Sequence, residues 1–156
     1  PGVAAAIPNV GTNVGTALPD ADDVADVAAI PGRIYERSGR VEVPANPEFG
    51  ASEHVATTVL AAMAVDADRR GALNLATDDA VLDVADARGL DVMEFDAGYE
   101  DRGERLVEQF ETRGRVPDVL FHRGAFGIEP ITYVLGETGA DAAGTAAELV
   151  ADAAET

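Results

Sequence analysis

The sequence predicts an α/β domain built in layers around a mixed β-sheet, and two observations lead to this prediction. The chain has 156 residues, of which 47% are hydrophobic, and this length and composition suit a single folded domain with a sizeable core. Along the chain, a hairpin pattern comes first and is followed by segments that alternate between helical and strand periodicity. Such alternation is typical of helices packed on a sheet.

Turn signals divide the first 50 residues into short segments. Pro31-Gly32 predicts a turn, and Ser38-Gly39 separates two short runs that have the pattern of a hairpin. Prolines at positions 44 and 47 predict a loop. The elements expected here are an extended apolar segment (1–19), an acidic turn or short helix (20–26), a hairpin (33–37 with 40–43) and a loop (44–50).

The clearest helix is expected over residues 52–66. Ser52 is a suitable N-cap, and Val55, Val59 and Met63 recur at helical spacing. Gly89 predicts the end of a second helix. In the second half of the chain we expect strands at 71–75, 90–95, 119–122 and 131–135, and helices at 78–88, 100–112 and 140–154.

Composition excludes several classes of function. The chain has no cysteine, so it has no disulfide framework, thiolate zinc site or cysteine nucleophile. The formal net charge is −18 and all eleven basic residues are arginine, which predicts a poor direct binder of nucleic acid, because like charges repel. His54 and His122 are 68 positions apart, without carboxylates at metal-ligand spacing, so we expect no metal site.

The charge balance predicts a cytoplasmic protein of a salt-loving organism. Lysine is absent, and the acids are 16 Asp and 13 Glu; in molar salt, where the Debye length is about 3 Å, such dense like charges hardly repel. Neither a membrane-spanning stretch nor a signal peptide is visible, so we expect no membrane association. Since the chain begins at Pro1, we expect residues 1–156 to form one domain in the C-terminal part of a longer protein.

The most informative run for an anion site is Phe49-Gly-Ala-Ser-Glu-His54. A glycine turn that leads into a capped helix exposes backbone N–H groups at the positive end of the helix dipole. Gly50, Ala51 and Ser52 are therefore candidate phosphate-binding residues, and His54 is a candidate hydrogen-bond donor or acid–base group. The alternative is a turn glycine, a capping serine and a surface histidine.

A second candidate follows the strand expected at 119–122. His122 and Arg123 stand at its end, which is where α/β sheets bind ligands, and arginine can hold a phosphate through two hydrogen bonds. The alternative is a glycine-rich loop whose arginine pairs with a surface acid. The candidate ligand-binding residues of this stretch are Arg123, Gly124, Gly127 and Glu129.

Three further polar residues complete the candidate set. Arg33 directly follows a predicted turn, and its alternative role is an exposed salt bridge worth about 0–1 kcal/mol. Asn74 lies within an apolar strand and needs a hydrogen-bond partner, which is either a ligand or the backbone. Asn13, in the glycine-broken first segment, is expected to sit in a bulge or to face a ligand.

Several of these runs occur in the order and at the spacing of one known family. They are Ile7-Pro-Asn-Val-Gly-Thr-Asn13, Ile30-Pro-Gly-Arg-Ile34, Val43-Pro44, Pro47-Glu-Phe-Gly-Ala-Ser-Glu-His-Val-Ala56, Ala72-Leu-Asn-Leu75, Glu94-Phe-Asp96, Arg115-Val-Pro-Asp118, His122-Arg-Gly124 and Gly127-Ile-Glu-Pro130. In this respect the chain resembles the archaeal thiamine-phosphate synthases of the ThiN type, nearly from end to end.

The resemblance implies a three-layer α/β/α fold like that of class II aldolases. It also implies a phosphorylated ligand of the thiamine pathway. Enzymes of the family join a pyrimidine pyrophosphate to a thiazole phosphate and release pyrophosphate, and His122 stands where a catalytic histidine of the family would stand. The family fuses this domain to a pyrimidine kinase or to a helix-turn-helix DNA-binding domain, and we expect a homodimer.

The chain also departs from the pattern of the enzymes. Ala97 and Ile128 occupy positions where the enzymes usually carry Arg and Lys, the segment 98–114 is short, and tryptophan is absent. Because departing pyrophosphate needs cationic stabilisation, we expect a domain that binds thiamine phosphate as the sensor of a transcriptional regulator, with DNA bound by an upstream domain. The alternatives are an active synthase, which would use Mg²⁺, and an interaction domain without a small ligand.

Overall fold

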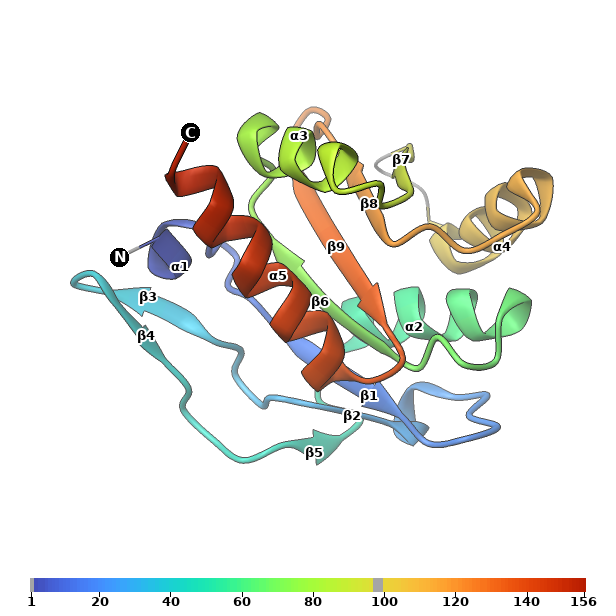
Figure 1. Ribbon diagram of the computed structural model, residues 1–156. Coiled ribbons are helices and arrows are strands. Elements are labelled where there is room, and N and C mark those ends of the chain that lie inside the picture. The colour runs from blue at the N-terminus through green and yellow to red at the C-terminus, as the bar shows by residue number, and fades with distance from the viewer. Residues whose placement is uncertain (1, 97–99) are drawn as a thin grey trace.

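A mixed sheet of seven strands forms the middle layer in the computed structural model, which describes residues 2–96 and 100–156 (Figure 1). Neighbouring strands are antiparallel except β7 and β8, which are parallel. The strands in spatial order are β5 (Glu48–Phe49), β2 (Val27–Ala29), β1 (Val14–Ala17), β6 (Gly71–Leu75), β9 (Ile131–Gly136), β8 (Val119–His122) and β7 (Val92–Glu94).

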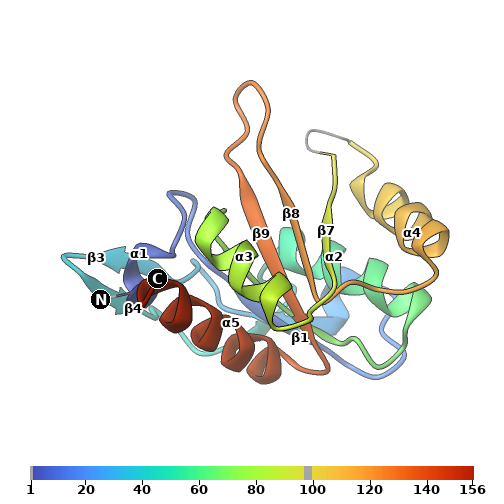
Figure 2. The ribbon, with the colours of Figure 1, turned by 45° about the horizontal axis from the view of Figure 1, so that its top comes forward.

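Helices cover both faces of this sheet, which confirms the predicted α/β/α layers (Figure 2). One face packs on α2 (Glu53–Val65) and α4 (Arg102–Arg113), and the other on α3 (Asp79–Ala87) and α5 (Gly139–Ala154). Side chains alternate between the two faces of a strand. Leu73 and Leu75 of β6 therefore belong to the core under α3 and α5, whereas Ala72 belongs to the core under α2.

The helices begin and end at the residues that local chemistry favours. Ser52 caps α2 by accepting the N–H of Val55, and Asp78 and Thr138 cap α3 and α5 in the same manner. Gly114 ends α4 in the left-handed conformation, with a φ of 79°. The helices predicted at 52–66, 78–88, 100–112 and 140–154 are thus confirmed, with ends shifted by up to two residues.

Some predicted elements differ in the structure. Residues 2–5, expected to be extended, form the short helix α1 (Gly2–Ala5). The strand β2 was not expected, and β5 lies in the predicted loop 44–50. Both are short and gain their strand character from pairing with remote segments, β1 and β2 respectively, rather than from their own composition. Ala97 lies outside the described residues.

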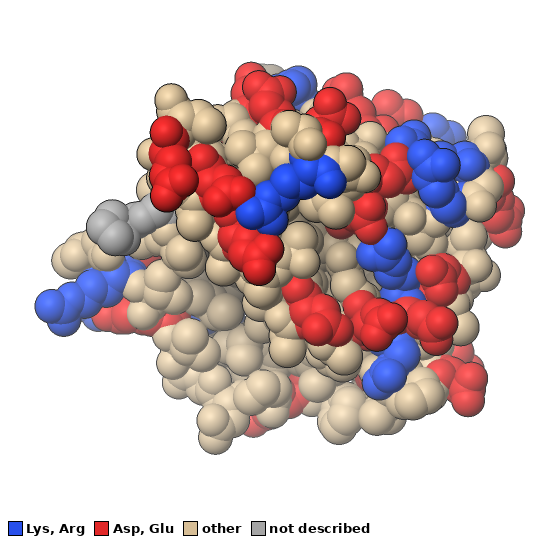
Figure 3. All heavy atoms as spheres, viewed as in Figure 1, with Lys and Arg blue, Asp and Glu red and all other residues tan. Residues whose placement is uncertain are grey.

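The expected hairpin forms a separate two-stranded sheet of β3 (Tyr35–Arg37) and β4 (Arg40–Glu42), and all six of its strand residues are exposed. Acidic side chains are spread over the face that carries α5, with arginines among them (Figure 3). Within the described part of the chain, no helix has the length and apolar character needed to cross a bilayer.

Candidate functional site

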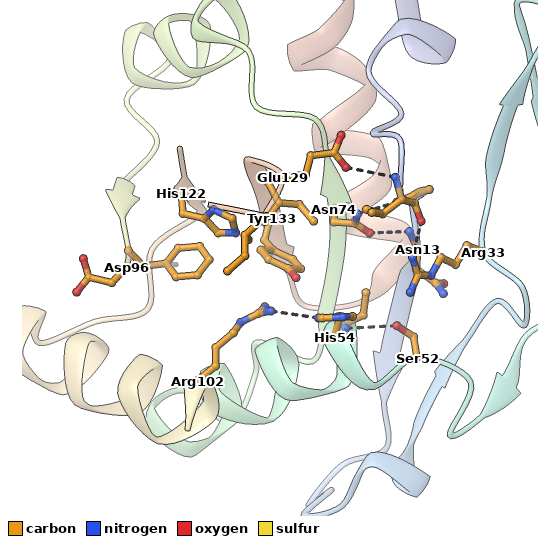
Figure 4. Close-up of a pocket in the computed structure, with 17 residues that line it drawn as sticks. Asn13, Arg33, Ser52, His54, Asn74, Asp96, Arg102, His122, Glu129 and Tyr133 are labelled. Carbon is orange, nitrogen blue, oxygen red and sulfur yellow. Dashed lines mark hydrogen bonds between the residues drawn. The ribbon is translucent and has the colours of Figure 1, made fainter. Parts of the chain in front are cut away.

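A pocket of about 410 Å³ lies at the carboxyl ends of β6, β7 and β8 (Figure 4). The first turn of α2, the segment before β1, the start of α4 and the loop between β8 and β9 complete its wall. Ligands of α/β proteins usually bind at this end of the sheet, beyond the carboxyl ends of the strands.

The structure brings eight of the twelve predicted site residues together at this pocket. They are Asn13, Arg33, Ser52, His54, Asn74, His122, Gly127 and Glu129. They come from five separate parts of the chain, so the pocket exists only in the folded protein.

Asn13 and Asn74 form a buried polar network that supports the pocket wall. Asn13 Oδ1 accepts the N–H groups of Val14 and Ile30, and Asn13 Nδ2 donates to the carbonyl oxygen of Ile30 at 3.0 Å. Asn74 Oδ1 accepts the N–H of Asn13 at 2.6 Å, while Asn74 Nδ2 donates to Gly11. Backbone groups therefore satisfy both side chains, which answers the question left open for Asn74.

One side of the pocket is cationic. Arg33 adopts a left-handed backbone conformation, with a φ of 67°, and donates to the carbonyl oxygen of Val10. His54 lies in the first turn of α2, and its Nδ1 is 3.3 Å from Arg102 Nη1. Since a guanidinium can only donate, His54 Nδ1 accepts and the proton resides on Nε2. Burial, followed by the charges of Arg102 and Arg33, lowers the pKa of His54.

His122 is buried at the end of β8, and its tautomer is fixed by its own loop. The N–H of Gly124 donates to His122 Nδ1 at 3.0 Å, so Nε2 carries the proton of the neutral ring. Burial and, to a smaller extent, the charge of Arg102 lower the pKa of His122. The ring packs edge-on against Phe95, with 5.1 Å between the ring centroids. His122 is therefore a neutral hydrogen-bond donor at neutral pH.

The loop between β8 and β9 closes one side of the pocket. The carboxylate of Glu129 accepts the backbone N–H groups of Asn9 and Val10 at 3.0 and 3.3 Å. This contact joins the loop to the segment before β1. Gly127 and Ile128 line the pocket beside Glu129.

Four predicted site residues lie outside the pocket lining: Gly50, Ala51, Arg123 and Gly124. Arg123 pairs with Asp79 at 2.9 Å and lies over the ring of Phe121. Gly124 has a φ of 84°, and a Cβ there would be 2.6 Å from the carbonyl oxygen of Ile128, so only glycine fits this turn. Gly50, with a φ of 75°, forms the turn that leads to α2.

Sequence reasoning missed Arg102, which enters the pocket from the start of α4. Its Nη2 donates to Thr58 Oγ1 at 2.6 Å, and its guanidinium lies 5.0 Å from the ring centroid of Tyr133. A cation in the first turn of a helix opposes the helix dipole. In a chain with only eleven arginines, that placement was the one available signal that Arg102 has a special role.

The family model described as thiamine-phosphate synthase ThiN matches residues 1–148. The chain belongs to the ThiN thiamine-phosphate synthase family. It is 32% identical to thiamine-phosphate synthase ThiN of Methanothermobacter thermautotrophicus (strain ATCC 29096 / DSM 1053 / JCM 10044 / NBRC 100330 / Delta H), over 92% of this chain and 81% of that protein.

Two further relatives carry the matching region as part of a larger protein. This ThiN domain is 35% identical to the bifunctional thiamine biosynthesis protein ThiDN of Methanocaldococcus jannaschii, over 83% of this chain but only 32% of that protein, so it spans about a third of that relative. A crystal structure of the C-terminal domain of phosphomethylpyrimidine kinase has a TM-score of 0.83 and 29% identity, and the match covers 94% of this chain and 88% of that one.

The described residues contain no cluster of three or more His, Asp or Glu side chains arranged to hold a metal ion. Asp96 pairs with Arg105 at 3.5 Å, and Glu129 is bound to backbone N–H groups. The hydrogen-bond donors of this ThiN pocket are suited to an anion.

Proposed function

We propose that the pocket binds thiamine phosphate and that this ThiN domain senses the ligand within a transcriptional regulator of thiamine biosynthesis. One observation carries the proposal: Arg33 and Arg102 flank His54 in the pocket and, among the described residues, neither has a carboxylate partner. A phosphate would supply the missing anion.

The charge balance of the chain gives this observation its weight. Acids outnumber arginines by 29 to 11, and seven arginines form ion pairs within the described chain. Four arginines of the described chain have no ion pair, and two of these, Arg33 and Arg102, lie at this one pocket, which supports an anionic ligand there. The N-terminus of α2, with the N–H groups of its first turn, adds to the same positive potential.

The remaining pocket surface suits the organic part of thiamine phosphate. Phe95, Ile131 and Tyr133 provide an apolar wall for a heteroaromatic ring, and the Glu129 carboxylate is placed to face a cationic thiazolium. The pocket volume of about 410 Å³ falls in the range of about 300–1,000 Å³ that is usual for small-ligand sites.

The loss of cationic side chains at two positions favours sensing over synthesis. Release of pyrophosphate calls for cationic groups around the leaving group, yet Ile128 lines the pocket at a position where the resemblance implies a lysine, and Ala97 occupies that of an expected arginine. DNA contact would then belong to another part of the full protein.

Calorimetric titration with thiamine phosphate in molar potassium chloride tests the binding step. We expect binding to the wild type and a loss of affinity of about tenfold or more in Arg33→Ala, because a charge-assisted hydrogen bond is removed. Arg37→Ala is the matched control, since it removes the same charge from a side chain that is 77% exposed. Absence of binding to the wild type would contradict the proposal.

The regulatory step needs the full-length protein. We expect thiamine phosphate to change its affinity for promoter DNA of thiamine-biosynthesis genes, measured by fluorescence anisotropy. If the affinity for promoter DNA is the same with and without saturating thiamine phosphate, the proposed regulatory role is refuted, even where the ligand binds. Sedimentation in the same buffer tests the expected homodimer.

The second candidate function is thiamine-phosphate synthesis, favoured by the position of His122 in the pocket and by 32% identity to a protein of that name. In this case Mg²⁺ would enter with the pyrophosphate substrate, because it is usually bound by one or two carboxylates and substrate phosphates. Incubation of both phosphorylated precursors with Mg²⁺ tests it. Turnover that His122→Ala abolishes would support synthesis over sensing.

A further inference from the structure

We propose that Arg102 binds the anionic group of the ligand and thereby couples occupancy of the pocket to the docking of α4 on α2. The inference deepens the proposed function, on which it rests. It assigns a ligand contact and a mechanical role to a residue on α4, the helix that lies beside α2 in Figure 1.

Arg102 already bridges the two helices. From the first residue of α4 it reaches Thr58 Oγ1 at 2.6 Å and His54 Nδ1 at 3.3 Å, both on α2. Thr58 is completely buried and donates its own hydroxyl proton to the carbonyl oxygen of His54. The acceptor for Arg102 is therefore fixed in position by the backbone of α2.

The guanidinium retains a donor that the described protein does not pair. Arg102 Nε is buried and, among the described residues, has no hydrogen-bond partner. The rings of Tyr133 and Phe95 lie 5.0 and 5.7 Å from the guanidinium carbon, and they hold the cation at the pocket without using its N–H groups. Because an unpaired buried donor is costly, a phosphate oxygen at this point is favoured.

The first turn of α4 depends strongly on this side chain. Asp101, which precedes the helix, makes no capping hydrogen bond, and the buried apolar contacts of α4, Leu106 and Phe110, come later in the helix. A Cβ at Gly103 would lie 3.3 Å from Thr57 Cγ2, so the two helices approach closely here. An anion bound to Arg102 therefore strengthens the contact that holds this turn against α2.

The first test compares affinities for two probes, thiamine phosphate and inorganic pyrophosphate, in molar potassium chloride. We expect Arg102→Ala to lose about tenfold or more in affinity for both. Arg102→Lys keeps the cation but not the planar fork and is expected to recover part of this loss. Arg37→Ala, as the exposed control, is expected to bind like the wild type. Thermal unfolding of each variant checks its fold.

The second test follows hydrogen exchange along α4, with each variant saturated by the probe. In the wild type we expect the amides of residues 105–110 to exchange about fivefold or more slowly with ligand, because local opening of the helix becomes less favourable. In Arg102→Ala and Arg102→Lys we expect little change. If the role of Arg102 were merely structural, its substitution would speed the exchange of α4 amides in the free protein, but the ligand would still slow that exchange.

The outcomes separate this inference from the proposed function. Binding of thiamine phosphate with equal affinity by the wild type and Arg102→Ala overturns the inference alone. Arg102-dependent binding of pyrophosphate without binding of thiamine phosphate supports the inference and refutes the ligand of the proposed function. Failure of both probes overturns both proposals. Loss of affinity without an Arg102-dependent change in α4 exchange overturns the coupling.

Discussion

Asn13 lines the pocket, but its side chain also holds the fold together. Asn13→Ala is therefore expected to lower the free energy of unfolding strongly. Asn13 is only 3% exposed, and its side chain makes three hydrogen bonds with backbone groups of Val14 and Ile30. These bonds fix residues 13–14, where β1 begins, to the end of β2. The substitution thus removes a link between two segments as well as a polar group of the pocket.

The magnitude follows from what the substitution leaves unpaired. The Ile30 carbonyl oxygen keeps a hydrogen bond from the N–H of Arg33, whereas the Ile30 N–H loses the Asn13 side chain as its acceptor. A buried donor without a partner costs about 1–3 kcal/mol, and each of the other two lost bonds costs about 1 kcal/mol. We therefore expect a loss of about 3–5 kcal/mol, a large share of the roughly 5–15 kcal/mol that stabilises a typical domain.

Urea unfolding in molar potassium chloride measures this loss as a lower midpoint with an unchanged slope. Asn13→Asp is an informative companion, because it keeps an acceptor for Ile30 N–H but turns a second oxygen toward the Ile30 carbonyl. The exposed Asn9→Ala, which keeps its backbone bond to Glu129, is the matched control. A loss below about 1 kcal/mol for Asn13→Ala would refute the account of this network.

Two further predictions concern backbone and pH. Gly71→Ala is expected to prevent folding, because its Cβ would lie 1.9 Å from the backbone carbon of Thr138. Gly144 has open space around it in α5, so Gly144→Ala is expected to raise the free energy of unfolding by about 0.5–1 kcal/mol. Expression as folded protein checks the first substitution, and urea unfolding checks the second. The folded pKa values of both histidines are lowered, so the unfolded chain binds more protons below about pH 6.5 and unfolding becomes easier as pH falls through those values. His122→Gln and His54→Gln are each expected to remove part of this pH dependence, because burial is the largest cause of both lowered pKa values; an unchanged pH profile in His122→Gln would contradict the burial argument.

Elements that carry their own boundary signals were predicted well. The capping residues Ser52 and Asp78 and the helix-ending Gly89 act within one or two turns of the chain, so their effect is visible in the sequence. The strands β2 and β5 have no such local signal. Val27–Ala29 is alanine-rich, and its place in the sheet comes from pairing with β1, which only the folded chain brings into contact.

The candidate site was predicted where polar residues stand at the ends of strands and helices. His54 and His122 meet at one pocket because α2 begins where β8 ends in space, and this meeting follows from topology. Sequence position could not decide which arginines point inward. Arg123 follows His122 directly but is drawn outward by Asp79, whereas Arg102 lies far along the chain and is drawn inward by Thr58.

A strongly negative chain can hold an anion because binding depends on local pairing more than on net charge. In molar salt the Debye length is about 3 Å, so the many surface carboxylates act on a bound anion hardly beyond contact distance. Within contact distance the described pocket presents Arg33, Arg102 and the start of α2, without a carboxylate paired to either arginine. The formal charge of −18 therefore predicts that the outer surface is a poor binder of nucleic acid. The class of ligand that we propose rests instead on Arg33 and Arg102, the two pocket arginines without an ion pair among the described residues.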